Sequence, residues 1–361
     1  MKKVIVGMSG GVDSSVAAYL LKQQGYDVTG VTMQIWQDED ESCQSENGGC
    51  GGLSAVEDAR RVANMLGIPY YVMNFKDDFR RNVIDYFVES YRNGLTPNPC
   101  IACNRFVKWE SLLLRSMQIG GDCIATGHYA KIRTMPNGRL SVCRSVTEEK
   151  DQTYALYSLT QEQLSRTVMP IGNYTKAEVR SIAEKAGLPV AHKRDSQEIC
   201  FIPDHDYASF VETYQDETLT QKSSIPGSFI DREGTVLGIH KGISHYTIGQ
   251  RKGLGLSFGK PVFVTEIRPE TNEVVIGPEA DLMKREVYAS HLNFMSDIPD
   301  STPRRVTAKI RYNHRGAPAE AFRTGEDTMT VVFDEPQRAA APGQAVVLYE
   351  GDSILGGGTI L

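Results

Sequence analysis

The feature that most constrains the fold lies at the start of the chain, where an apolar strand runs into a glycine turn and then a helix. Val4–Met8 is the predicted strand, Ser9-Gly10-Gly11 is the turn, and Ser14–Gln24 is the predicted helix. Two glycines allow the backbone to turn sharply and to approach a ligand closely. The freed N–H groups and the helix N-terminus then point to one place, which predicts an anion-binding site.

The first half of the chain continues this alternation of strands and helices. Further strands are predicted over Val28–Ile35, Tyr70–Asn74 and Cys123–Thr126. Helices are predicted over Ser54–Leu66, where Ser54 and Glu57 have the pattern of a capping box, and over Asp77–Arg92, Lys108–Ile119, Thr175–Ala186 and Asp206–Tyr214. The alternation predicts a parallel sheet with helices on both faces, and ligands bind such sheets at the carboxyl ends of the strands.

Beyond about residue 218 the pattern changes to short apolar runs separated by Gly, Pro, Asn and Asp. These runs are Gly227–Asp231, Val262–Ile267, Glu273–Ile276, Arg305–Arg311, Met329–Phe333 and Ala345–Tyr349. This spacing predicts an all-β region, with two small barrels as one arrangement. A length of 361 residues agrees with two or three domains.

Composition sets the chemical context. No apolar run approaches the ~20 residues of a membrane span, and the N-terminus lacks the pattern of a signal peptide, so we expect a cytoplasmic protein. Its seven cysteines are then expected to be thiols, metal ligands or redox groups rather than structural disulfides. The net charge of −6 argues against a generally basic surface, but residues 299–323 carry six Lys and Arg against two Asp and Glu. This window is a candidate nucleic-acid contact.

The glycine turn belongs to the longer pattern SGGVDSS, which contains an acidic residue and lacks the lysine of a Walker A loop. Asp13 would repel a phosphate unless Mg²⁺ lies between them or unless Asp13 caps the helix. Gly127 and His128 follow the strand Cys123–Thr126, and Met33 ends another strand in the same layer. These positions suit contacts to an adenine or a ribose.

Three of the cysteines are candidates for chemistry. Cys100 and Cys103 form a CxxC in a proline-bounded loop, and Cys200 lies beside charged residues after the helical region. A CxxC pair can form a redox disulfide, half of a metal or iron–sulfur site, or a reactive nucleophile. For Cys123 and Cys143 we expect burial. A metal clip formed by Cys43 and Cys50 remains open. SGGVDSS resembles the PP-loop of the ATP pyrophosphatase superfamily, which splits ATP between the α- and β-phosphates. Together, such an AMP-forming loop and reactive thiols suggest thiolation, in which ATP activates a carbonyl oxygen and a cysteine-bound sulfur replaces it.

Several motifs, spread in order over essentially the whole chain, resemble one family. They are GMSGGVDSS, TPNP-x-x-x-C-N, ATGHY, KDQ-x-Y, KRDSQEICFIP, HYTIGQRKGLGL, PGQ and GGG. The first resembles the PP-loop of the ATP pyrophosphatase superfamily, and the full set resembles the tRNA-specific 2-thiouridylases. The resemblance implies an N-terminal PP-loop domain (adenine nucleotide alpha hydrolase-like) over residues 1–205, a small central β-rich domain over 206–277, and a C-terminal β-barrel over 278–361.

The resemblance also implies an activity and its partners. Such an enzyme is a tRNA uridine 2-sulfurtransferase, which replaces the C2 oxygen of the wobble uridine, position 34 of the tRNAs for Lys, Glu and Gln, with sulfur. It uses ATP with Mg²⁺, passes through an adenylated intermediate, and releases AMP and pyrophosphate. A cysteine desulfurase or a sulfur-relay protein supplies the sulfur as a persulfide.

Residue roles carry over by motif. Cys103 is implied as the nucleophile and Cys200 as the persulfide carrier, and the two are implied to form a disulfide during the cycle. The implied ATP-binding residues are Gly7, Met8, Ser9, Gly10, Gly11, Val12, Asp13, Ser14, Met33 and Gly127. The implied tRNA-binding residues are Asn98, Pro99, Cys100, His128, Lys150, Asp151, Gln152, Arg311, Tyr312 and Gln344.

One position departs from the family. Many members carry Asp where this chain has Cys100, and that carboxylate is proposed as a general acid/base. Either Cys100 or water takes over the proton transfer, or Cys100, Cys103 and Cys200 are three ligands of a [4Fe–4S] cluster, as in related tRNA-thiolating enzymes. Two further alternatives are another PP-loop adenylating ligase, which makes a C–N bond, and an RNA-binding protein without activity.

Overall fold

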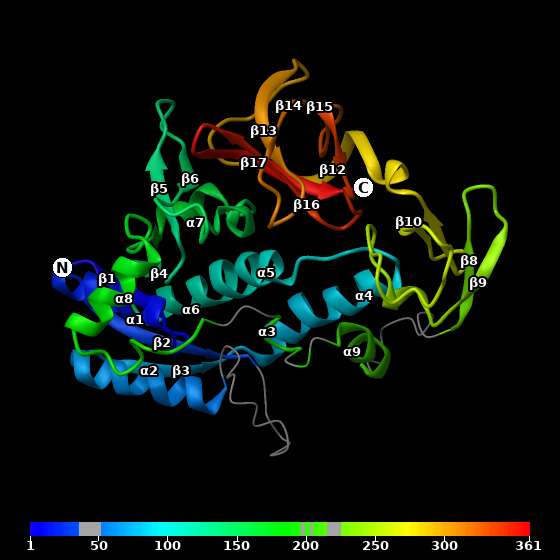
Figure 1. The fold of residues 1–361 in the computed structure, drawn as a ribbon. Coiled ribbons are helices and arrows are strands. Elements are labelled where there is room, and N and C mark those ends of the chain that lie inside the picture. Colours follow the sequence, from blue (N-terminus) through cyan, green and yellow to red (C-terminus); the bar gives the residue numbers. More distant parts are fainter. Residues whose placement is uncertain (36–51, 196–198, 203, 205, 215–224) are drawn as a thin grey trace.

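The computed structural model describes residues 1–35, 52–195, 199–202, 204, 206–214 and 225–361. Cys43 and Cys50 lie outside these residues, and so does the metal clip considered for them. No helix in the described part of the chain is long and apolar enough to cross a membrane. Three regions follow one another: an α/β region, a small sheet and a β-barrel (Figure 1).

The N-terminal region contains a five-stranded sheet in the order β3-β2-β1-β4-β7, with parallel pairing throughout. Its strands are β1 (Lys3–Gly7), β2 (Asp27–Gln34), β3 (Tyr70–Asn74), β4 (Cys123–Ala125) and β7 (Thr167–Val168). The predicted parallel sheet is therefore confirmed. The central strand β1 and its neighbour β4 are largely buried, because apolar cores cover both faces.

Helices on the two faces of the sheet build these cores. On one face lie α1 (Val12–Gln23), α2 (Leu53–Leu66) and α8 (Lys176–Lys185). On the other lie two long helical runs: α3, η2 and α4 (Lys76–Phe79, Arg80–Asp85 and Tyr86–Arg92), followed by α5, η3 and α6 (Pro99–Ala102, Cys103–Leu112 and Leu113–Gln118). Shorter helices are η4 (Thr153–Leu156), α7 (Gln161–Ser165) and α9 (Tyr207–Thr213).

Two local predictions for this region are wrong. Helix α2 has Gly52 as its N-cap and no side-chain cap, so Ser54 and Glu57 do not form a capping box. The second long helical run begins at Pro99 rather than at Lys108, because Pro99 occupies its first position and the Asn98 side chain caps it. The CxxC therefore lies on a helix and not in a loop.

The middle of the chain forms a four-stranded sheet in the order β10-β11-β8-β9. Its strands are β8 (Gly227–Ile230), β9 (Val236–His240), β10 (Phe263–Arg268) and β11 (Glu273–Gly277), and the short helices η6 (Ile243–His245) and η7 (Glu279–Leu282) flank it. A separate apolar core that includes Phe229, Tyr246 and Val264 packs against this sheet. In Figure 1 the sheet extends to one side of the molecule, away from the N-terminal region.

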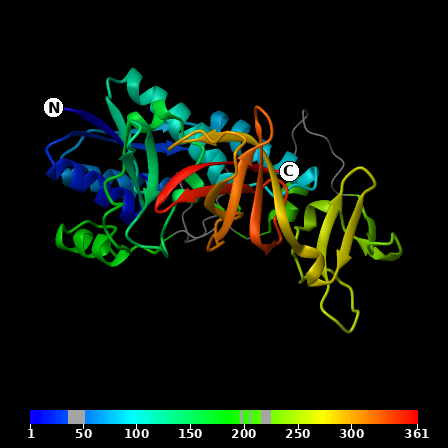
Figure 2. The same ribbon diagram turned by 90° about the horizontal axis from the view of Figure 1, so that it is seen from above.

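The C-terminal region is a closed six-stranded barrel in the order β12-β15-β14-β13-β16-β17, closed by pairing between β12 and β17. Its strands are β12 (Met283–Phe294), β13 (Arg304–Lys309), β14 (Ala317–Arg323), β15 (Thr328–Arg338), β16 (Ala345–Glu350) and β17 (Ser353–Ile360). A hairpin of the N-terminal region, β5 (Ala130–Thr134) and β6 (Leu140–Arg144), joins its sheet where Cys143 pairs with Ser353. Figure 2 shows the barrel between the N-terminal region and the central sheet.

Candidate active site

The glycine turn lies between β1 and α1, at the carboxyl end of the sheet. Gly10 has φ of 71°, and a Cβ atom at this position would lie 2.3 Å from the backbone oxygen of Ala55 in α2. Only glycine fits both this left-handed backbone and this close approach. The α1 N-terminus has no side-chain cap, so the backbone N–H groups of its first turn are available to an anion.

The serines of the turn hold its shape. The Ser14 hydroxyl accepts a hydrogen bond from Ser9 N at 3.2 Å and lies 3.3 Å from Ser9 Oγ. The Ser15 hydroxyl donates to Gly11 O at 2.8 Å. Ser14 and Ser15 are both buried, whereas Ser9 is exposed. Of the three hydroxyls, that of Ser9 is therefore the most accessible to a phosphate.

Asp13 neither caps the helix nor lies free. Its carboxylate accepts hydrogen bonds from Lys176 Nζ, at 2.8 and 2.9 Å, and from the Tyr129 hydroxyl, at 2.8 Å. Burial, followed by the Asp13 charge, raises the pKa of Tyr129, so this hydroxyl remains a donor. The ammonium of Lys176 therefore offsets the negative charge that would otherwise face a phosphate.

Asp195 extends this network toward the segment that carries Cys200. It forms ion pairs with Lys176 at 2.7 Å, Lys150 at 3.0 Å and Arg180 at 3.2 Å. Burial alone would raise the pKa of Asp195, but the hydrogen bonds from Lys176 and Lys150 bring it below its usual value. Asp195 is therefore ionised at neutral pH and joins α8 to the strand ends.

Lys193 provides a second link from the same segment to the glycine turn. Its ammonium donates to Gly10 O at 3.2 Å and to Asp58 Oδ2 at 2.7 Å. The roles of Lys176, Arg180 and Lys193 were missed by the sequence analysis. The only sequence signal was that each is a basic residue in or beside a helix predicted to pack on the sheet.

The predicted nucleotide residues beyond the turn lie at the same edge of the sheet. A Cβ atom on Gly127 would lie 2.5 Å from Ser14 N and 2.6 Å from the carbonyl carbon of Asp13, so the chain after β4 abuts the first turn of α1. Met33, near the end of β2, is partly buried against the apolar core. The carboxyl ends of β1, β2 and β4 thus surround one site.

The helix that begins at Pro99 presents both cysteines of the CxxC. The Asn98 side chain accepts hydrogen bonds from Cys100 N at 3.1 Å and from Ile101 N at 3.2 Å. Cys100 is exposed, and Cys103, one turn later, is half-buried. Farther along the same helix, Lys108 Nζ lies 3.5 Å from the Nε2 atom of His128, which directly follows Gly127. The helix is therefore tied to the strand end that faces the glycine turn.

Cys200 is exposed, and the residues around it converge on the same core as Cys103. The Phe201 ring packs edge-on against Phe79 and Phe87, with centroids 5.7 and 5.3 Å apart. Cys103 and Ile199 both pack at the margin of this core cluster. Two segments far apart in sequence are thus brought to one apolar cluster, while the predicted disulfide remains a prediction.

Burial sets the state of Cys123 and Cys143, and the distances between possible ligands test the metal hypothesis. Cys123 and Cys143 are fully buried, as predicted, and burial raises the pKa of each thiol. Among the described residues, no group of three or more His, Cys, Asp and Glu side chains lies close enough together to hold a metal ion. The arrangement of Cys100, Cys103 and Cys200 therefore does not fit a three-cysteine iron–sulfur site.

Comparison with known proteins agrees with this arrangement. Residues 2–204 match the family described as the tRNA methyl transferase HUP domain, residues 213–278 the tRNA methyl transferase PRC-barrel domain, and residues 284–360 the aminomethyltransferase beta-barrel domain. The tRNA-specific 2-thiouridylase MnmA of Lachnoclostridium phytofermentans is 63% identical, over 100% of both chains. That of Clostridioides difficile is 56% identical, over 99% of this chain and 98% of its own.

The chain belongs to the tRNA-specific 2-thiouridylase family. The predicted membership and fold class are confirmed, while the exact domain boundaries remain predictions. Among solved structures, NMN synthetase from Francisella tularensis matches 54% of this chain and 66% of its own, with 18% identity and a TM-score of 0.33.

In this 2-thiouridylase family member, Cys100 lies near Tyr312, which packs against Tyr154 of η4. Burial, followed by the charges of Asp151 and Cys100, raises the pKa of Tyr312. The Tyr312 ring packs edge-on against Tyr154, with centroids 6.2 Å apart, and Lys309 Nζ lies 5.9 Å from the Tyr154 centroid. Asp151, Tyr312 and Cys100 are thus brought together from three distant parts of the sequence.

Four other predicted tRNA contacts are engaged by the protein itself. Asn98 caps the cysteine helix, and Gln152 Oε1 accepts from Tyr129 N at 2.9 Å. His128 is buried, which lowers its pKa well below the usual value, and it hydrogen-bonds with Thr126 Oγ1 at 2.7 Å. Gln344 donates to a backbone oxygen of the segment before Pro99. Contact between these residues and RNA remains a prediction.

Carboxylates neutralise part of the positive charge of the basic window, residues 299–323, in the folded protein. Arg304 pairs with Asp297 at 2.7 Å, and its Nη2 lies 2.8 Å from Glu350 Oε2. Arg305 Nη1 lies 2.6 Å from Asp334 Oδ1. These carboxylates lie outside the window and compensate two of its positive charges. Arg311, whose Nη1 donates to Arg338 O at 2.9 Å, stays the predicted contact with RNA in this window.

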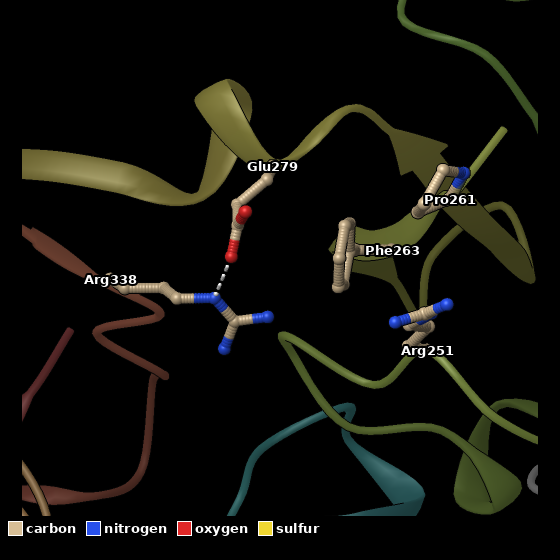
Figure 3. Close-up of a pocket in the computed structure, with 5 residues that line it drawn as sticks. All are labelled: Arg251, Pro261, Phe263, Glu279 and Arg338. Atoms are coloured by element: carbon tan, nitrogen blue, oxygen red, sulfur yellow. Dashed lines mark hydrogen bonds and ion pairs between the residues drawn. The ribbon is translucent and has the colours of Figure 1, made fainter.

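Figure 3 shows a pocket between the central sheet and the barrel, lined by Arg251, Pro261, Phe263, Glu279 and Arg338. Arg338 donates to Glu279 at 2.8 Å and stacks over the Phe263 ring at 5.1 Å. None of the predicted site residues lines this pocket. The candidate active site of this 2-thiouridylase family member is therefore at the strand ends and not here.

Proposed function

We propose that this protein is a tRNA-specific 2-thiouridylase, an enzyme that replaces the C2 oxygen of the wobble uridine with sulfur at the expense of ATP. One observation carries the proposal: both cysteine-bearing segments are tied to the strand ends that hold the glycine turn. Lys108 and His128 tie the Cys103 helix, and Lys193 and Asp195 tie the Cys200 segment. An adenylating site and two thiols are what such a reaction requires.

In the first step, the C2 oxygen of the uridine attacks the α-phosphorus of ATP, and the bond to the β-phosphate breaks. Pyrophosphate leaves, and the oxygen becomes part of a good leaving group. The N–H groups at the start of α1 would bind the phosphates, and Lys176 and Lys193 would supply positive charge. A wobble base suits this chemistry because an unpaired loop base is readily extruded into a pocket.

In the second step, the terminal sulfur of a Cys200 persulfide attacks C2, and AMP leaves with the former carbonyl oxygen. The Cys103 thiolate then attacks the Sγ atom of Cys200. The sulfur–sulfur bond of the persulfide breaks, thiouridine is released, and a Cys103–Cys200 disulfide forms. An external dithiol reductant supplies the two electrons that reopen this disulfide.

The surroundings of the cysteines suit this division of roles. Cys200 is exposed, so a cysteine desulfurase or a sulfur-relay protein could reach it to deliver the persulfide. Cys103 is half-buried beside the core, where the substrate base would shield it from solvent. Cys100 lies beside Tyr312, where its thiol could take the proton-transfer role assigned to aspartate in other members. A tRNA substrate fits the cytoplasmic location predicted from the sequence.

Mg²⁺ was predicted to accompany ATP. The carboxylate nearest the glycine turn, Asp13, is already bonded to Lys176 and Tyr129, and the described residues contain no cluster of metal ligands. These residues do not fit a protein-bound Mg²⁺, and no step above depends on one. The same absence of a ligand cluster argues against the iron–sulfur alternative.

The test is to incubate the enzyme with ATP, a cysteine desulfurase, labelled cysteine and unmodified tRNA, and to measure 2-thiouridine by mercury-affinity electrophoresis. We expect Cys103→Ser and Cys200→Ser each to abolish 2-thiouridine formation. Cys200→Ser should also lose the protein-bound sulfur label, whereas Cys103→Ser should keep it. Cys143→Ser is the matched control, because Cys143 is buried in β6 away from both segments. Near-normal 2-thiouridine formation by either of the first two variants would disprove the assigned role.

The same incubation separates the alternatives. Another PP-loop ligase would release pyrophosphate without requiring tRNA, because its acceptor is an amine. An RNA-binding protein without activity would bind tRNA and release no pyrophosphate. A 2-thiouridylase should release one pyrophosphate for each thiolated uridine.

A further inference from the structure

The segment before the CxxC helix is fastened to the barrel by a turn that contains Gln344. Thr96 N donates to Pro342 O at 2.8 Å. The Gln344 side-chain amide donates to Thr96 O at 3.1 Å and to Pro97 O at 3.3 Å. Three hydrogen bonds therefore join two segments about 250 positions apart in sequence.

The barrel side of this junction is rigid. Gly343 N donates to Ile360 O at 2.9 Å, and Ile360 N donates to Gln344 O at 2.7 Å, so β17 fixes the backbone on both sides of the turn. Gly343 has φ of 88°, and a Cβ atom there would lie 3.0 Å from both Leu95 Cβ and Thr96 N. Glycine therefore allows the turn to approach the cysteine-bearing segment this closely.

The side-chain carbonyl oxygen of Gln344 has a longer contact. It lies 3.5 Å from the hydroxyl of Tyr154, a fully buried residue that also donates to Ala345 O at 2.8 Å. The amide nitrogen has two N–H donors, and two backbone oxygens accept from them. Both N–H donors of the Gln344 side chain are therefore used within the protein while the junction is intact.

A second anchor holds the chain after the CxxC. Asn104 Nδ2 donates to Ala155 O at 2.9 Å, and Lys108 Nζ donates to Asn104 Oδ1 at 2.9 Å. Ala155 directly follows Tyr154, so both anchors meet the same short helix, η4. The turn that carries Cys100 and Cys103 lies between two fixed points.

We propose that Gln344 is a positioning residue for the cysteine helix. By fastening Thr96 and Pro97 to the barrel, its amide sets where the helix begins and hence where Cys100 and Cys103 meet the base. The proposal rests on the thiolation function proposed above. It would also give the barrel a role in a reaction that takes place at the sheet.

Kinetics distinguish positioning from RNA contact. We expect Gln344→Ala to bind tRNA with wild-type affinity in a filter-binding assay and to thiolate bound tRNA about 100-fold more slowly in a single turnover, the effect of misplacing a reacting group by about 1 Å. Gln337→Ala is the matched control, because this barrel glutamine pairs with His314 and not with the cysteine-bearing segment. Weakened tRNA binding with a normal rate at saturation would overturn the proposal.

A readout that does not depend on thiolation completes the test. Hydrogen exchange of peptides covering residues 93–98 should be faster in Gln344→Ala than in the wild type, and unchanged in Gln337→Ala. The carbonyl groups of Thr96 and Pro97 lose their side-chain donor, so the neighbouring bond from Thr96 N to Pro342 O should open more often. Unchanged exchange in Gln344→Ala would also overturn the proposal. If the wild type fails to thiolate tRNA, the proposed function is wrong, whereas faster exchange in the variant would still establish the fastening.

Discussion

At the level of single residues, Lys176 sets the charge of the glycine turn. Its ammonium bonds both oxygens of Asp13 and also pairs with Asp195. Without it, the Asp13 carboxylate would keep only the neutral Tyr129 hydroxyl as a partner, and its charge would face an entering triphosphate in a partly buried site, where charges interact strongly.

We expect Lys176→Met to weaken ATP binding by about 10- to 100-fold, the loss typical of a hydrogen bond between charged groups. Calorimetric titration with a non-hydrolysable ATP analogue measures this affinity. Lys185→Met is the matched control, because Lys185 lies on the same helix and is exposed. Equal affinities for the two variants would show that Lys176 does not act on the nucleotide.

From the sequence one could predict that Asp13 would repel a phosphate, but not that Lys176 neutralises its charge. The residues of the loop motif are adjacent in sequence, so the motif predicts only the backbone conformation of the loop itself. The partner of Asp13 lies 163 positions away, and only the folded sheet brings the two together. The same applies to Lys193, which reaches Gly10 across 183 positions.

At the level of elements, the close packing of β4 against α1 fixes the phosphate site. Gly127 has no Cβ atom, and this allows the chain after β4 to touch the backbone of Asp13 and Ser14. A methyl group there would have to displace backbone atoms rather than a flexible side chain.

Gly127→Ala should therefore weaken ATP binding by at least about 10-fold and lower stability by about 1–3 kcal/mol, as overpacking does. Gly138→Ala is the control, because Gly138 has φ of 82° and no atom near its missing Cβ. The control should lose stability through backbone strain and keep its affinity for ATP. Thermal melting and nucleotide titration measure both effects, and full ATP affinity in Gly127→Ala would contradict this account.

Most strands and helices were predictable because their patterns are local. The β5–β6 hairpin was missed, since its function in the fold is to extend a barrel whose other strands come 140 or more positions later. The start of the cysteine helix was missed because Pro97 and Pro99 indicate a loop, whereas Pro99 in fact takes the first helical position.

At the level of the whole molecule, pairing with carboxylates from other strands distinguishes the arginines of the basic window. Arg305 and Arg311 lie in the same basic window, but Arg305 is paired with Asp334 while Arg311 lies beside Tyr312. A count of charges along the sequence cannot make this distinction, because the compensating carboxylates come from other strands.

We expect Arg311→Ala to weaken tRNA binding by about 10-fold and to reduce the slope of log affinity against log salt by about 1, as the loss of one phosphate contact does. Arg305→Ala should leave tRNA binding unchanged, because an exposed paired arginine contributes little. Filter binding over a range of salt concentrations measures both variants. Equal losses would mean that the whole window contacts RNA.

The pairing of β17 with β12, β16 and β6 has a consequence for the timing of synthesis on the ribosome. Gly343 and Gln344 are held to β17 by two backbone hydrogen bonds with Ile360. A nascent polypeptide could therefore assemble the nucleotide-binding sheet early, yet its thiols would acquire their working geometry only after residues 353–360 have emerged from the exit tunnel and entered the barrel. Partly translated molecules would bind ATP without being able to modify RNA.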